Sequence, residues 1–368
     1  MNVELSILLT AASVAIGCSL VGTLLVLRRM SLISDAISHS VLLGIVLAFL
    51  ATRDLNSPWL LVGAAAVGVL TVVLIQLLLG TRRLREDSAI GLVFPLLFSI
   101  GVILITRMAG DVHLDTDAVL LGELGFAWMD TASVLGMDLP RSFIVSSAVL
   151  LANLLFVTLC YKELKLSIFD AGLAASLGFS PLLLHYLLVS LVSVTAVASF
   201  DAVGSILMVA LMIAPPSAAW LLSRSLAQML GWSALLATVS AVGGYYLAVR
   251  IDSNIAGCIA AACGICFLVC WLLAPERGLV SRWMQQAEQR LLFPAQMLAV
   301  HIANHEGRPE EPVECNTENI AEHMHWQEQF AREVIGYAQR HRMLREQDSI
   351  LRLTEEGRGI AEKLMLHG

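Results

Sequence analysis

An acid and an imidazole stand four residues apart in an otherwise apolar stretch near the start of the chain. Asp35 and His39 lie within Arg28–Leu50, which reads RRMSLISDAISHSVLLGIVLAFL. Residues four apart share one face of a helix, so the carboxylate and the imidazole can aim at one point. An aspartate inside a bilayer span costs about 2.5–3.5 kcal/mol and normally faces a cavity, a partner or an ion. We therefore expect the function of the chain to centre on this helix face.

The composition indicates a polytopic membrane protein. Of the 368 residues, 57% are hydrophobic and only 14% are charged, and the mean hydropathy is +0.78, outside the range of soluble globular domains. Apolar runs of membrane-spanning length fall near 5–27, 32–51, 59–79, 88–106, 142–160, 182–200, 203–223, 226–249 and 253–274. We predict an all-α polytopic membrane protein with about eight to nine transmembrane helices, in a transmembrane domain over residues 1–274. The first run has no basic region before it, so we expect a retained span rather than a signal peptide.

Basic residues in the short loops predict the orientation of these spans. With nine spans, one side holds Arg28, Arg29, Arg82, Arg83, Arg85, Lys162, Lys165, Arg224, Arg277 and Arg282. We expect this side to be the cytoplasm, with the N-terminus outside and the C-terminus inside. The outer segment 107–141 carries six acids around an apolar stretch at 118–128. We expect a re-entrant or interfacial helix there, either attracting a cation or forming an ordinary solvated loop.

A short apolar helix is expected between the fifth and sixth spans. It should cover Phe169–Leu177 and stop at Gly178 and Pro181. Because it is too short to cross a membrane, it could pack into a groove on a partner protein or serve as a simple connector.

Two features inside the spans have mainly structural interpretations. Pro215 and Pro216 interrupt the helical hydrogen-bond ladder, which predicts a kinked, pathway-lining helix. Cys263 and Cys266 form a C-x-x-C in an apolar span, where small packing residues are a simpler explanation than a metal or redox site.

Residues 275–368 form a separate domain by composition. They contain eleven basic residues, fifteen acidic residues and six of the nine histidines, and no apolar span. We expect helices at 294–305, 317–325, 327–341 and 354–366, a loop at 307–314 and an extended pair near 343–353. The last part looks like the wing and closing helix of a winged helix-turn-helix, so we expect a small cytoplasmic winged-helix-like α+β domain. Its net charge of −4 makes nucleic acid an unlikely partner.

This domain also carries residues that could bind metal. His301 and His305 are four residues apart, and together with Cys315, His323 and His325 they could form a regulatory metal site. The alternative is that they are ordinary surface histidines of a polar domain.

Three segments together resemble a known family. MSLISDAISHSVLLGIVLAF is similar to the second-helix signature of the permease subunits of manganese/zinc/iron ABC importers. FDAGLAASLGFSP resembles their coupling helix, and VGSILMVALMIAPPSAAWLL resembles a late helix of the same permeases. The resemblance covers roughly residues 5–274, and the C-terminal extension resembles the longer, TroD-type permeases.

The resemblance implies that Asp35 and His39 coordinate a transported divalent metal, Mn²⁺, Zn²⁺ or Fe²⁺, with no bound cofactor. Oxygen and nitrogen ligands suit all three ions. Ser38 and Ser40 could donate supporting hydrogen bonds. Two permeases meeting on a two-fold axis would offer two carboxylates and two imidazoles. The alternative is an aspartate and a histidine that bond only to each other.

The resemblance also implies the partners and the location. The chain has no G-x-x-x-x-G-K-[ST] and hence no phosphate cradle, so it is not expected to be an enzyme and the energy must come from a partner ATPase. We expect ABC ATPase subunits, a second permease that is a paralogue or an identical copy, and an extracytoplasmic metal-binding protein. The expected location is the cytoplasmic (inner) membrane, with many passes through the lipid bilayer. The ATPase contact is expected at Asp170, Leu173, Ala174 and Gly178.

Two other functions stay open at this point. In an ion-coupled secondary metal transporter, Asp35 would relay protons. In a membrane-tethered metal-responsive regulator, residues 275–368 would bind DNA, against their acidic balance.

Overall fold

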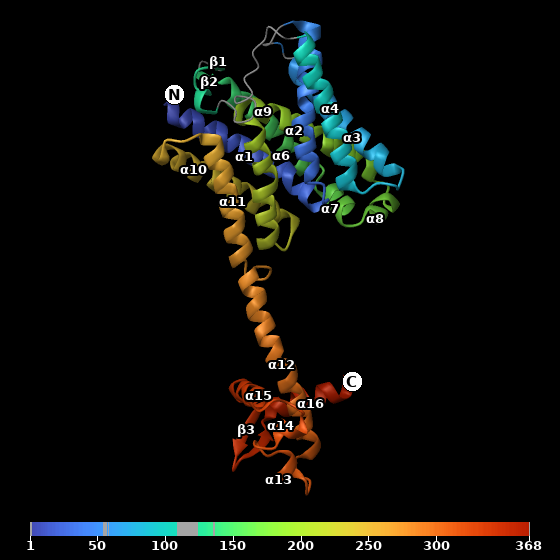
Figure 1. Ribbon diagram of the computed structural model, residues 1–368, viewed down its shortest axis with the longest axis vertical. Helices are drawn as coiled ribbons and strands as arrows, with labels where there is room; N and C mark the ends of the chain where they lie inside the picture. The colour runs from blue at the N-terminus through green and yellow to red at the C-terminus, as the bar shows by residue number, and fades with distance from the viewer. Residues whose placement is uncertain (1, 54–56, 58, 109–123, 135–136, 368) are drawn as a thin grey trace. The chain divides into compact units, whose positions relative to one another are not determined.

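The computed structural model describes residues 2–53, 57, 59–108, 124–134 and 137–367. The chain divides into two compact units, Met1–Arg277 and Gly278–Gly368, and both are mostly helical (Figure 1). Within the described residues, nine helical stretches of the first unit are long and apolar enough to cross a membrane. This confirms the predicted number of spans.

The helices of the first unit follow the predicted order. They are α1 Val3–Leu27, α2 Leu32–Thr52, α3 Trp59–Gly80, α4 Glu86–Met108, α6 Arg141–Leu159, α7 Tyr161–Phe169, α8 Ala171–Ser176, α9 Pro181–Leu222, α10 Leu226–Ile251 and α11 Ile255–Leu273. Helix α1 is central and packs on α6, α9 and α10, whereas α2 packs on α3, α4 and α9. Helix α2 therefore lies between α9 and the α3–α4 pair.

Buried polar side chains join the helices of this bundle. Ser13 Oγ lies 2.6 Å from Ser146 Oγ, and Asn153 Nδ2 donates to the Gly17 carbonyl (3.1 Å). Such bonds satisfy groups that find no water in the hydrocarbon, and they add to the packing that holds membrane helices together.

Helices α2 and α3 approach each other at a pair of glycines. A Cβ atom on Gly44 would lie 2.4 Å from the Gly63 carbonyl oxygen, and one on Gly63 would lie 2.7 Å from that of Gly44. Only hydrogen fits at this distance. At 3.6 residues per turn, Gly44 is about 180° around the helix from Asp35, so α3 packs on the face opposite the acid.

The break in α9 differs from the prediction. This 42-residue helix departs from helical geometry at Gly204 (φ 77°, ψ 170°), a conformation that essentially only glycine adopts, whereas Pro215 and Pro216 lie buried inside the helical part. The expected kink is therefore replaced by a break eleven residues earlier, near the start of the seventh span.

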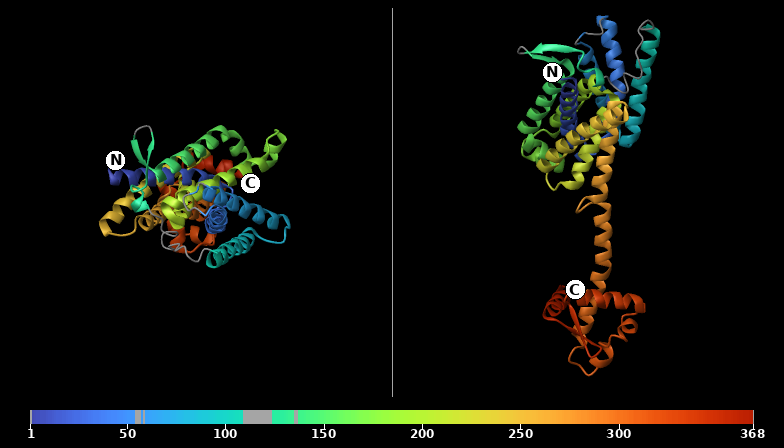
Figure 2. Two further views of the ribbon diagram at one scale, coloured as in Figure 1. Left: turned by 90° about the horizontal axis from the view of Figure 1, so that it is seen from above. Right: turned by 90° about the vertical axis from the view of Figure 1, so that its left-hand side faces the viewer.

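The segment 107–141 contains a β-hairpin that the sequence analysis missed. The expected helix at 118–128 lies mostly outside the described residues. The part that is described forms a 3₁₀ turn, Leu124–Phe126, followed by β1 Thr131–Val134 and β2 Met137–Pro140. The two strands are antiparallel (Figure 2), with Thr131 opposite Pro140.

The described part of the second unit contains five helices and a second hairpin. These are α12 Leu279–His305, α13 Glu311–Glu314, α14 Ile320–His323, α15 Glu328–Arg340, β3 Leu344–Gln347, β4 Ile350–Leu353 and α16 Glu355–His367. Helices α14, α15 and α16 lie where helices were expected. Helix α13 lies in the expected loop at 307–314, and α12 begins fifteen residues before the expected 294. The core includes Leu298 and Ile302 of α12, Ile320 of α14, and Leu351 of β4.

Candidate functional site

Asp35 and His39 lie next to each other on α2. His39 Nε2 is 3.5 Å from Asp35 Oδ1. The His39 side chain is 39% exposed and the Asp35 side chain is 44% exposed. Their neighbours Ile33, Ala36 and Ile37 are fully buried. The acid and the imidazole therefore form an open edge on a helix whose other faces are packed.

Helix α4 supplies an aromatic wall beside the pair. The His39 ring stacks on Phe94, with ring centroids 5.6 Å apart, and meets Phe98 edge-on at 6.1 Å. These contacts place two aromatic rings of α4 directly beside the imidazole.

The pair is too small to hold a transition metal alone. One carboxylate and one imidazole supply two ligand groups, whereas Zn²⁺ takes four ligands in structural sites and Mn²⁺ favours six. A half-exposed carboxylate on a membrane helix is also costly against lipid. This face therefore requires a cover that offers polar groups or water.

The structure corrects the roles expected for Ser38 and Ser40. Both hydroxyls are buried. Ser38 donates to the Ser34 carbonyl (2.7 Å), and Ser40 donates to the Ile37 carbonyl (3.1 Å) and accepts from Thr71 of α3 (2.7 Å). Each lies one residue from His39 and so points about 100° away around the helix. Their hydroxyls stabilise helix packing rather than the site.

The expected coupling segment is two helices rather than one. The chain leaves helical geometry at Asp170, whose Oδ1 accepts from the Leu173 amide (2.9 Å) and so caps α8. Helix α8 then ends before Gly178, which has a φ of 87°. Ala174, expected at the ATPase contact, is fully buried where α8 packs on α7 and α9. It anchors the segment instead.

Helix α8 lies at one end of the first unit (Figure 1), and large apolar side chains in and beside it are exposed. We call this exposed group the α8 surface, and it consists of Phe169, Leu173, Leu177 and Phe179. Phe169 is 66% exposed and Leu177 is 61% exposed. A cluster of large apolar side chains on a loop that is too short to span the membrane is typical of a protein-binding site.

A polar cluster that the sequence analysis missed connects this end of the bundle to α2. Arg28, just before α2, donates through Nη1 to His185 Nδ1 of α9 (3.1 Å) and through Nη2 to Ser167 Oγ of α7 (3.2 Å). The Gln76 amide of α3 lies 3.1 Å from His185 Nε2. The available signal was one amide and one imidazole in two separate apolar runs, Gln76 and His185, which does not reveal that they meet.

In the second unit, three potential ligands come together. His301 and His305 of α12 and Glu314 of α13 each offer one ligand atom, and these atoms lie within 4.8 Å of one another. His323 lies beside them, with Nδ1 3.1 Å from Glu314 Oε2. Glu314 was not expected at this site, because it falls in the loop predicted at 307–314.

Two residues of the expected set lie differently. Cys315 is fully buried in the core of the second unit. Burial, followed by the nearby carboxylates of Glu311, Glu306 and Glu314, raises the pKa of its thiol to about 11. His325 is exposed, with a φ of 53°. Neither belongs to the group of three ligand atoms.

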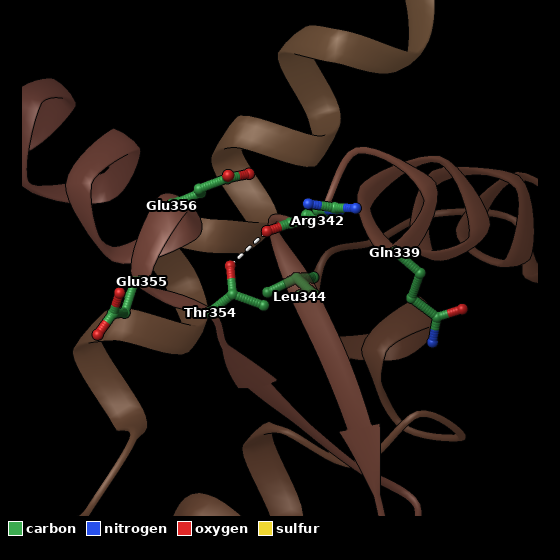
Figure 3. Close-up of a pocket in the computed structure, with 6 residues that line it drawn as sticks. All are labelled: Gln339, Arg342, Leu344, Thr354, Glu355 and Glu356. Carbon is green, nitrogen blue, oxygen red and sulfur yellow. Dashed lines mark hydrogen bonds between the residues drawn. The ribbon is translucent and has the colours of Figure 1, made fainter.

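A separate shallow pocket lies between α15, β3 and the start of α16 (Figure 3). Glu355, Glu356 and Arg342 line it together with Gln339, Leu344 and Thr354, whose hydroxyl donates to the Arg342 carbonyl. Two acids against one base make it a poor site for phosphate.

Comparison with known proteins gives a consistent result. The sequence matches the ABC 3 transport family over residues 2–274. It is 45% identical over 358 residues to the zinc transport system membrane protein TroD of Treponema pallidum, covering 97% of this chain and 98% of that protein. It is 44% identical over 283 residues to the manganese transport system membrane protein MntD of Bacillus subtilis, covering 77% and 96%.

A solved structure is similar as well. PsaBC from Streptococcus pneumoniae in complex with Fab covers 78% of this chain and 96% of its own, with a TM-score of 0.64 and 28% identity. The family match ends at residue 274, whereas the similarity to TroD extends over nearly all of the chain and so includes the second unit. The membrane helices, the full-length similarity and the fold agree, and the chain belongs to the ABC 3 transport family.

Proposed function

We propose that the chain is the permease subunit of an ABC importer that moves Mn²⁺, Zn²⁺ or Fe²⁺ across the cytoplasmic membrane. The observation that carries the proposal is the Asp35–His39 pair, an oxygen and a nitrogen ligand on the open face of a membrane helix. TroD and MntD, named as zinc and manganese transport proteins, support a divalent metal as the substrate.

The open face of α2 supports a second permease as the missing cover. A copy or a paralogue, related by a two-fold axis, would bring a second carboxylate and a second imidazole to the same point. Together they supply four ligand groups and remove both acids from lipid. The aromatic wall of Phe94 and Phe98 would then limit access of water to the ion.

Two clusters at the ends of helices support the proposed orientation. Arg28, Ser167 and His185 are hydrogen-bonded at one end of the bundle, and Arg224 Nε donates to Glu276 Oε2 (3.2 Å). These loops carry much of the basic charge, which supports the cytoplasm on this side. An extracytoplasmic metal-binding protein would deliver the ion at the opposite side.

The α8 surface is the proposed docking site for the ATPase, with Leu173 as its central contact. ATP binding would draw the two ATPase subunits together and move α7 and α8 with them. Through the Arg28–His185 cluster this motion reaches the start of α2 and changes which side of the metal site is open, which is the alternating-access mechanism. Asp170 and Gly178 act at the two ends of α8 by fixing its position.

We place the second unit in the cytoplasm and propose a winged-helix arrangement for it. Support comes from the antiparallel β3–β4 hairpin followed by α16, and from the bridge that pairs Asn316 with Ile350 as a third short strand. Nucleic acid is a poor partner for it, because residues 275–368 carry a net charge of −4.

Uptake by the assembled transporter tests the proposal. The chain is reconstituted in vesicles with its second permease, ATPase and metal-binding protein, and ATP-dependent Mn²⁺ and Zn²⁺ accumulation is measured. His39→Ala should abolish accumulation while assembly and basal ATP hydrolysis persist. Leu47→Ala, an exposed position on the same helix, is the matched control and should transport normally.

Two outcomes would contradict the proposal. Undiminished accumulation by His39→Ala would make the pair structural. Accumulation that needs no ATPase and collapses when a protonophore dissipates the proton gradient would indicate a secondary transporter.

A further inference from the structure

We infer that the second unit binds one divalent transition-metal ion through His301, His305 and Glu314, with His323 positioning the carboxylate. The three ligand atoms lie within 4.8 Å of one another, and all three residues are partly buried. His301 and His305 lie in the last two turns of α12, and Glu314 lies at the end of α13. The fold therefore brings the ligands together from two separate helices.

The hydrogen bond of His305 leaves its other nitrogen free. Its Nδ1 lies 2.9 Å from the His301 carbonyl oxygen. A carbonyl only accepts, so Nδ1 carries the proton and Nε2 keeps its lone pair. Metal-ligating histidines almost always donate their second nitrogen to a carbonyl or carboxylate in this way.

Glu314 is held by both neighbouring histidines. Its Oε2 lies 3.1 Å from His323 Nδ1 and 3.7 Å from His301 Nε2. By the rule used for His305, His301 Nε2 carries a proton and donates to the Glu314 carbonyl oxygen, 3.1 Å away. A metal therefore binds His301 through Nδ1 or displaces this hydrogen bond. Without a metal, these contacts hold the Glu314 carboxylate between the two rings. When a metal is bound, the hydrogen bond from His323 would fix the orientation of the carboxylate.

The hydrophobic core fixes the backbone beneath the ligands. Ile302 lies between the two histidines of α12, Cys315 follows Glu314, and both are fully buried. Ligands on anchored elements need only side-chain rotation to close on an ion. In a tetrahedral zinc site the ligand atoms are roughly 3.3 Å apart, so the observed group must contract by about 1.5 Å at most.

Two nitrogens and one oxygen define the class of ion. Imidazole suits zinc and the other later first-row metals, whereas Mg²⁺ and Ca²⁺ prefer oxygen ligands alone. With three protein ligands, the fourth position of a tetrahedral ion is open to water. Cys315 is buried away from this position, so we expect no sulfur ligand.

Zinc binding to the full-length chain in detergent tests this inference without the ATPase, and its outcome is therefore independent of the proposed transport function. Affinity is measured by competition with a chromophoric chelator in a His39→Ala background, which removes the membrane pair. His305→Ala and Glu314→Gln should each weaken zinc binding by more than about 100-fold, since even supporting partners are worth about 10–100-fold. His323→Ala should weaken it by about tenfold.

His325→Ala removes an exposed histidine two residues from His323 and should leave the affinity unchanged. Cys315→Ser should also leave it unchanged, and Co²⁺ bound to the wild-type chain should show no thiolate charge-transfer band. Zinc binding that survives His305→Ala, or that His325→Ala reduces equally, would overturn the inference.

A measurement on the unsubstituted chain covers the case in which a variant fails to fold. Zinc should protect His301 and His305 from acylation by diethylpyrocarbonate at least about tenfold, while His325 reacts at the same rate with and without the ion. Equal reactivity of His305 in both conditions would also overturn the assignment.

Discussion

Asp35 and His39 in α2, and His301 and His305 in α12, are pairs with the same spacing on their helices. In α2 the pair lies on an open face, about 40% exposed, beside two aromatic rings. In α12 the pair is completed within the same unit by Glu314 and its neighbour His323. Under the proposed function, the first pair takes its remaining ligands from another subunit, whereas the second is a set that one chain can close.

This difference matches the roles proposed for the two sites. A permease must release its ion, so a site shared between two subunits that move apart is an advantage. A site that reports metal concentration must stay intact while its occupancy changes. The i, i+4 spacing of two ligands on a helix therefore does not distinguish a transport site from a site that keeps its metal. The two kinds of site differ in how many ligands the same rigid unit supplies.

The largest effect should come from removing the membrane carboxylate. We expect Asp35→Asn to lower ATP-driven metal uptake by more than about 100-fold, because it keeps the shape but loses the charged ligand. Zinc affinity at His301, His305 and Glu314 should not change. If uptake survives, or if both properties fall together, the two sites do not have the separate roles that the comparison assigns them.

A charge on the α8 surface should act on the membrane site alone. Leu173→Asp is expected to weaken ATPase association by roughly 30-fold, about 2 kcal/mol, the scale of an interface hot spot. Copurification and ATP-driven uptake measure this. Ala175→Asp, on the opposite side of the same short helix, is the control; an equal loss there would mean that charge on α8, not the apolar contact, is responsible.

The position of the open face depends on the contact between α2 and α3. A methyl group at Gly44 would meet the Gly63 carbonyl at 2.4 Å, so Gly44→Ala should lower the free energy of unfolding of the membrane unit by about 1–3 kcal/mol. Thermal unfolding in detergent measures the change. Gly91→Ala, where an added Cβ meets nothing within 4 Å, should be nearly neutral.

The smallest effect is expected from the second unit. Deleting residues 281–368 should leave uptake possible but reduce its inhibition by cytoplasmic metal about fivefold, at the lower end of allosteric coupling. Initial uptake rates at buffered metal concentrations on that side measure the response. His305→Ala should reproduce the deletion and His325→Ala should not. Unchanged inhibition in the deletion variant would leave the second unit without a regulatory role.

Periodic and compositional features of the chain were predictable. Hydropathy located all nine spans, and the spacing of Asp35 and His39 indicated a shared face. Contacts between distant segments could not be predicted, because isolated polar residues such as Gln76 and His185 carry no information about each other. The sequence predicted a kink at Pro215 and Pro216, whereas the helix breaks at Gly204. The backbone conformation of Gly204 depends on how the two halves of α9 meet, which the sequence does not show. Glu314 was missed for a similar reason, since a loop acid has no periodic pattern.

The place of Asp35 in the first turn of α2 has an electrical consequence. At 1.5 Å per residue, Asp35 and His39 lie about 4.5 and 10.5 Å from the start of the helix, in a hydrocarbon core about 30 Å thick. With the proposed orientation, an incoming divalent ion crosses roughly two-thirds of the membrane field before it binds, worth roughly 3 kcal/mol per 100 mV. Uptake measured at clamped potentials should accordingly depend on voltage in its loading step. In an inside-negative cell, the membrane potential would therefore favour metal binding at Asp35 and His39. ATP would be needed mainly to open the short remaining path to the cytoplasm.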